Sequence, residues 1–82
     1  MKAPIINLNG DNKQTLADEA MRALEAISGA INALNAMTVH GRNYAGDRAA
    51  HVQAVNDFTR IYSTLREIGE EMQSYYVDII DQ

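Results

Sequence analysis

The stretch VHGRNYAGDR, residues 39–48, decides how this 82-residue chain folds. It is the only polar, glycine-punctuated break in the middle of the sequence, and a long segment with helical periodicity lies on each side of it. Gly41 is placed to end the first helix, because glycine readily takes the left-handed conformation that follows many helices. Asp47 is placed to cap the second helix, with Gly46 before it. We therefore predict a connecting loop at residues 40–47.

The segment before this loop is predicted to form a helix over residues 12–39. Asp11 is the expected N-cap, with Gln14 as its capping-box partner, and Thr15 with Asp18 is the alternative start. The apolar residues are spaced alternately four and three apart, which is typical of a helix that faces the core of a bundle. This stripe comprises Leu16, Ala20, Ala23, Ile27, Ala30, Leu34 and Met37, widened by Leu24 and Ile31.

The segment after the loop is predicted to form a second helix over residues 48–76. One apolar stripe comprises Val55, Phe58, Tyr62, Leu65, Gly69, Met72, Tyr76 and Ile79. A second stripe, with its members seven residues apart, comprises Ala54, Ile61, Ile68 and Tyr75. Residues 75–80 are rich in strand formers, so we expect helix to give way to extended chain there.

The short loop makes the two helices antiparallel neighbours. Residues 1–10 contain Pro4 and the Asn9-Gly10 pair, which favour an extended arm, and this arm is expected beside the C-terminal tail. The fold class is therefore all-α, a single helical-hairpin domain over residues 1–82. Each apolar stripe is wider than one partner helix can cover. We expect a homo-oligomer, a dimer or higher, to complete a four-helix bundle.

Composition excludes several classes of protein. The chain has no cysteine, which removes disulfides and thiol chemistry. Its net charge of −4 argues against duplex nucleic acid as a partner, because binding to phosphates needs a basic face. The apolar stretch behind Lys2 is too short for a signal peptide, and no later segment approaches a membrane span. These features indicate a cytoplasmic protein.

The loop region collects the residues that suit binding of an anion. Arg42 and Arg48 can each grip phosphate oxygens, while Tyr44 or a histidine ring can stack on a base. The start of the second helix adds free N–H groups and a partial positive charge. The candidate ligand-binding residues are His40, Gly41, Arg42, Asn43, Tyr44, Arg48 and His51. An alternative interpretation is that these residues only cap helices and close the loop.

No arrangement of residues predicts catalysis, a cofactor or a metal. His40 and His51 are separated by a loop, and neither has a second ligand at an established zinc spacing. Adjacent carboxylates such as Glu70 and Glu71 diverge around a helix and are typical of a solvated surface. We therefore expect that the protein is not an enzyme.

The motifs Leu8-Asn9-Gly10 and His40-Gly41-Arg42-Asn43-Tyr44 give the chain a resemblance to a group of small phage-encoded proteins. Those proteins are helical, with a Leu-Asn-Gly start and a His-Gly-Arg-Asp-Tyr loop. This chain has Asn43 where the group has Asp, and a shorter segment after Tyr44. The resemblance implies a phage protein acting in the host cell cytoplasm, where short accessory genes often counter host defence.

Three functions follow from this resemblance and from the loop chemistry. By analogy with the small oligomeric sponges of anti-Thoeris and anti-CBASS type, the chain is expected to sequester a cyclic nucleotide or an ADP-ribose-derived signal at the loop. The second hypothesis is a protein–protein inhibitor of a host defence complex that acts through the acidic helical surface. That surface comprises Glu67, Glu70, Glu71, Asp78 and Asp81. The third is a structural phage assembly component.

Overall fold

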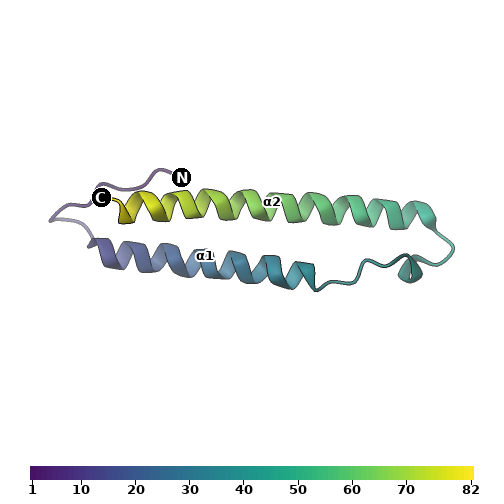
Figure 1. The fold of residues 1–82 in the computed structure, drawn as a ribbon. Coiled ribbons are helices and arrows are strands. Elements are labelled where there is room, and N and C mark those ends of the chain that lie inside the picture. Colours follow the sequence, from purple (N-terminus) through teal and green to yellow (C-terminus); the bar gives the residue numbers. More distant parts are fainter.

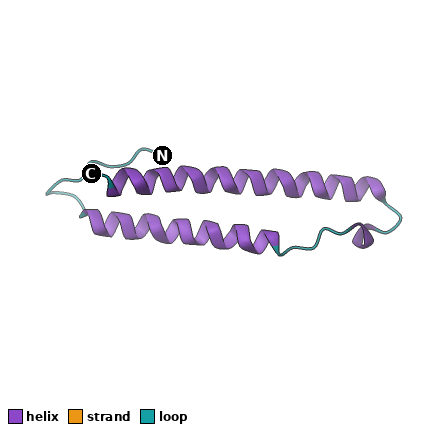
Figure 2. Ribbon diagram, in the orientation of Figure 1, coloured by secondary structure: helices purple, strands orange, loops and turns teal.

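The computed structural model describes residues 1–82 and contains two long helices joined at one end (Figure 1). Helix α1 spans Lys13–Asn35 and helix α2 spans Arg48–Ile80, with a short 3-10 helix, η1, at Gly41–Tyr44 between them. There are no strands (Figure 2). The helices run antiparallel, so the predicted all-α hairpin is confirmed. The molecule is a rod of 64 × 18 × 16 Å. Neither helix contains a segment both long and apolar enough to cross a membrane.

Helix α1 begins one residue later than the Asp11 cap predicts. Asn12 is the N-cap, and its side-chain oxygen accepts a hydrogen bond of 2.8 Å from the backbone N–H of Thr15. Asparagine and aspartate cap helices about equally well, so local chemistry does not choose between the two positions. Gln14 does not close a capping box either, because its side chain donates to the Asp18 carboxylate at 2.7 Å. Both capping predictions were wrong.

Helix α1 ends at Asn35, four residues before the predicted end. The N–H of Ala36 is shared between the carbonyls of Asn32 and Ala33, each at 3.2 Å, which tightens the last turn. Gly41 is not the C-terminal residue of this helix but the first residue of η1. The β-branched residues Thr38 and Val39, which favour extended backbone, separate the two.

Helix α2 continues to Ile80, so the predicted change to extended chain after residue 76 was wrong. Its last turns carry Ile79, which is fully buried, and Tyr75 and Tyr76, which pack beside it. Burial of these side chains against α1 outweighs the modest preference of such residues for strands.

The predicted stripes form most of the contact between the helices. Stripe residues such as Leu34 and Leu65 are half-buried, and Ile31 beside the α1 stripe is half-buried too, whereas Ala30, Met37 and Val55 are exposed. A straight helix has 3.6 residues per turn, so a strict seven-residue repeat rotates by about 20° per repeat relative to its partner. This rotation agrees with the exposure of Ala30, whereas Leu34 one turn later stays half-buried, and Met37 lies beyond the end of α1. On α2, Ile61 and Ile68 of the second stripe are exposed, while Ala54 and Tyr75 at its two ends are half-buried.

The buried core lies at the end of the rod that carries both termini. Only Ala17, Ala20 and Ile79 are buried, and Ala3 and Ile6 of the arm pack on them. The Gln82 side chain ties the arm down: it accepts from the Ile6 N–H at 2.9 Å and donates to the Pro4 carbonyl at 2.7 Å. The extended arm beside the C-terminal tail is thus confirmed, and it pairs within one chain.

Candidate functional site

The loop between the helices is a compact, internally bonded turn. Backbone N–H groups of Asn43 and Asp47 donate to the carbonyls of His40 and Tyr44 at 3.0 and 2.9 Å. Gly46 has φ of +81°, the only positive φ in the chain, which a residue with a side chain adopts only with strain. This conformation turns the backbone from η1 into α2. Asp47 then caps α2 as predicted, with its carboxylate accepting from the Ala50 N–H at 2.9 Å.

His51 on the first turn of α2 fastens the loop to the helix. Its Nε2 lies 3.2 Å from the Val39 carbonyl oxygen. A carbonyl can only accept, so Nε2 carries the proton and Nδ1 is left as an acceptor when the ring is neutral. The ring also lies against Tyr44, with centroids 5.6 Å apart and planes tilted by 37°. His51 therefore holds both Val39 and Tyr44 in place.

These residues line an open hollow of about 440 Å³ at the loop end of the rod. Four of the seven predicted site residues lie in its wall: Gly41, Tyr44, Arg48 and His51. The remaining wall comprises Ala45, Gly46 and Asp47. From the sequence, Gly46 and Asp47 were expected only to turn the chain and to cap α2. The helix-cap pattern itself was the signal that they lie beside Arg48.

His40, Arg42 and Asn43 are exposed and do not line the hollow. In η1 successive side chains lie about 120° apart, so Arg42 and Asn43 diverge from Tyr44, and His40 precedes the helix as its N-cap. The structure therefore divides the predicted site into two groups. One group surrounds the hollow, and the other faces solvent.

Charge in the hollow is mixed. The Arg48 guanidinium makes no ion pair, since the ion pairs of the chain join Met1 to Glu71 and Arg60 to Asp57. The Asp47 carboxylate, however, already accepts the Ala50 N–H, in the position where a phosphate would bind at a helix start. An anionic ligand would therefore have to bind through Arg48 and the two rings, with little help from the amides of α2.

Two further hollows lie along the hairpin. One has a mixed polar and apolar wall and comprises Met21, Leu24, Glu25, Ser28, Gly29, Asn32, Gln73 and Tyr76. The other is mostly apolar and comprises Leu34, Met37, Val39, Tyr44, Ala54, Asp57, Phe58 and Ile61. Neither was predicted from the sequence. The apolar hollow lies where α1 has ended, and periodicity alone does not reveal that end. No three His, Asp or Glu side chains come together in a metal-binding group.

The acidic residues near the end of α2 are exposed. Glu71 lies 3.6 Å from the N-terminal ammonium, and the other four make no ion pair. We call these five exposed residues, Glu67, Glu70, Glu71, Asp78 and Asp81, the carboxylate row.

No protein-family model matches this chain, and no curated protein or solved structure is significantly similar to it. Inference about function therefore rests on the residues and surfaces described above.

Proposed function

We propose that this protein is an interaction module that works as a homo-oligomeric helical bundle and has no catalytic activity of its own. The observation that carries the proposal is the amount of surface that one chain leaves uncovered. A single chain exposes 6070 Å², whereas a compact 9.1 kDa protein is expected to expose about 4,900 Å². Its radius of gyration of 18.4 Å compares with roughly 12 Å for a compact domain of this length.

The excess area is about 1,200 Å² per chain. A standard protein–protein interface buries about 800 Å² on each partner, so the excess is enough for one such interface. Only three residues of 82 are buried, which is too few to hold a rod of this length together by itself. Association with further copies supplies the missing burial.

Sedimentation equilibrium or native mass spectrometry of the purified full chain tests this proposal. We expect a discrete oligomer at micromolar concentration, with the helix content unchanged on moderate dilution. A stable, fully helical monomer at all accessible concentrations would overturn it.

Capture of a nucleotide-type ligand at the loop end is the second candidate. It is favoured by the convergence of Tyr44, Arg48 and His51 on one hollow, in which the Arg48 guanidinium has no ion-pair partner. A cyclic or ADP-ribose-derived nucleotide would place its phosphate on Arg48 and its base on the Tyr44 ring. A phage counter-defence role, in which such a signal is sequestered, belongs to this candidate.

Native mass spectrometry with a panel of such nucleotides tests the second candidate. Arg48→Ala should reduce binding at least about tenfold, since charge-assisted hydrogen bonds to phosphate are among the stronger polar contacts. Arg66→Ala, an exposed arginine far along α2, is the matched control and should bind normally. Absence of any discrete mass addition in the wild type would remove this candidate and leave the oligomer proposal unaffected.

Inhibition of a host complex through the carboxylate row is an alternative for the same oligomer. It is favoured by the exposure of five carboxylates along the last turns of α2 and at its C-cap. Charge reversal at Glu67 and Glu70 should abolish capture of a basic partner, and added salt should weaken capture by the wild type.

A further inference from the structure

We infer that a second copy of this chain docks on one particular side of the hairpin, the apolar face. We define the apolar face by two rows of residues: Ala23, Ala26, Ala30 and Ala33 on α1, with Met37 just beyond the end of that helix, and Ala54, Ile61, Ile68 and Tyr75 on α2. The inference rests on the proposed oligomer and goes further, because it states which surface forms the interface.

The two rows lie on the same side of the rod. Spacings of three and four place the α1 row along one flank of that helix, and spacings of seven do the same on α2. Met37 and Ile61, one from each row, line the same hollow at the loop end. The rows therefore form one continuous surface that crosses both helices.

The arm covers this surface at the terminal end and nowhere else. Its N-terminus lies 3.6 Å from Glu71, and Ala3 and Ile6 pack on the core cluster beside Tyr75. Under this cover Ile79 is fully buried. Beyond it, Ile68 is 47%, Ile61 40% and Met37 60% exposed. The chain thus supplies its own cover for one end of the apolar face and leaves the loop-side half open.

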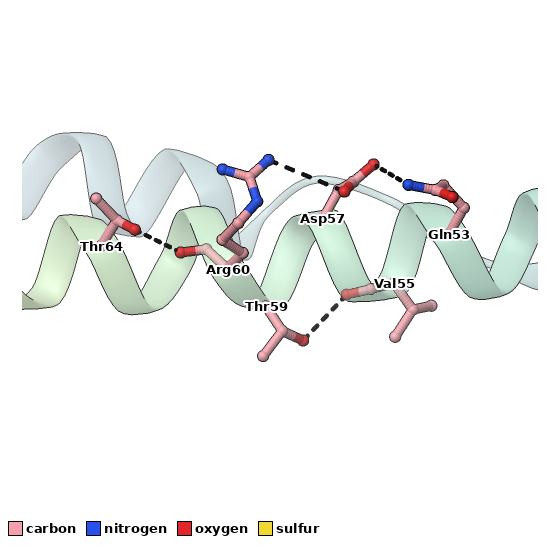
Figure 3. A network of polar contacts seen from close by, with 6 residues as sticks. All are labelled: Gln53, Val55, Asp57, Thr59, Arg60 and Thr64. Carbon is pink, nitrogen blue, oxygen red and sulfur yellow. Dashed lines mark hydrogen bonds and ion pairs between the residues drawn. The ribbon is translucent and has the colours of Figure 1, made fainter.

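The loop-side half of the apolar face has the properties of an interface core. Its rows contain no charged residue, and the alanine row of α1 lets another helix approach closely. One charge, that of Asp57, lines the hollow at the loop end between Ala54 and Ile61. Its carboxylate contacts Gln53 at 3.5 Å and Arg60 at 3.9 Å along α2, so this charge has polar partners within the same chain (Figure 3).

The opposite side of α2 is less suited to docking. Figure 3 shows Val55 and Thr59 along the edge of α2 opposite Asp57. Farther along that side Arg66 and Glu70 interrupt the apolar residues. Burying these charges without partners would cost more than their neighbours contribute.

A second copy is the occupant that the surface fits. The α1 row has mostly small alanine side chains, and the α2 row has the larger side chains of Ile61, Ile68 and Tyr75. The two rows are therefore complementary in shape, and the same chain carries both. A two-fold arrangement lets each copy provide both rows. The excess area of about 1,200 Å² per chain exceeds the roughly 800 Å² that each partner buries in a standard interface.

Sedimentation equilibrium of paired variants tests the inference. Ile68→Glu should raise the dissociation constant of the oligomer at least about 100-fold, because it buries a charge at the centre of the interface. Val52→Glu is the matched control: Val52 is 49% exposed on the same helix but lies off the apolar face, so the constant should change less than about threefold.

A second pair of variants distinguishes loss of association from loss of folding. Ala30→Glu places the charge on α1, and Asn32→Glu places the same charge on the other side of that helix. Alanine and glutamate are both good helix formers, so circular dichroism should show full helix content in each. Only Ala30→Glu should dissociate the oligomer.

The outcomes separate this inference from the proposed function. An oligomer that survives both Ile68→Glu and Ala30→Glu, or that dissociates equally with Val52→Glu, overturns the assignment of the apolar face and leaves the proposed oligomer standing. A monomeric wild type overturns both, and the face would then belong to a different protein.

Discussion

The apolar side chains between the helices are covered at the terminal end of the rod and left partly open at the loop end. At the terminal end, two helices and an arm enclose Ile79, and Gln82 bonds to the arm backbone on both sides of Ile5. At the loop end, α1 stops at Asn35, so the first turns of α2 are covered only by the connecting loop. Two helices cannot enclose a core, and a third segment is needed. Where the arm provides it the core is closed, and elsewhere the hairpin stays open.

The largest expected effect is at Ile79. Replacing it with alanine removes the centre of the only closed core and should lower the free energy of unfolding by about 3 kcal/mol. Val52→Ala, an exposed site at the loop end, should cost less than about 0.5 kcal/mol. Urea denaturation followed by circular dichroism, at one fixed protein concentration, measures both. Equal losses would contradict the contrast between the two ends.

Removal of residues 1–7 should have the next largest effect. Without the arm, Ile79 and its neighbours are exposed at one side, and we expect a loss of about 2 kcal/mol. Hydrogen exchange should accelerate over the last turns of α2 and remain unchanged around residues 48–60. Acceleration spread uniformly along the rod would mean that the arm does not act locally.

A smaller effect is expected at the start of α1. Asn12→Ala should cost about 1 kcal/mol, since it leaves the Thr15 N–H without its partner. Asp11→Ala should be neutral within about 0.3 kcal/mol, as its side chain caps nothing. A larger loss at Asp11 would restore the cap predicted from sequence.

An effect of similar size is expected at the loop. Gly46→Ala forces a side chain into the positive-φ region and should cost about 1 kcal/mol. Gly41→Ala is the matched control, because an added Cβ would meet the His51 ring at an ordinary 3.5 Å. Thermal unfolding of both variants should show a lower midpoint only for Gly46→Ala.

The sequence predicts which residues gather near the loop, but it does not predict which of them line the hollow and which face solvent. The Asp47 cap follows from a local rule about helix starts, and so does the placing of Arg48 and His51 on the first turn of α2. The exposure of Arg42 and Asn43 depends on η1, and that of His40 on its place as the N-cap of η1, within the connection from Asn35 to Asp47. Local sequence patterns did not predict this short 3-10 helix.

The sequence by itself determined the two helices, the loop between them, the extended arm and the antiparallel order. These features depend on periodicity, proline, glycine and capping residues, which act over a few neighbouring positions. Only the tertiary structure decided where α1 ends, how far α2 continues, and which apolar residues stay exposed. Those features depend on contacts between segments far apart in the chain, such as Gln82 with Pro4 and His51 with Val39. The free energy of such contacts outweighs the small local preferences of the residues involved.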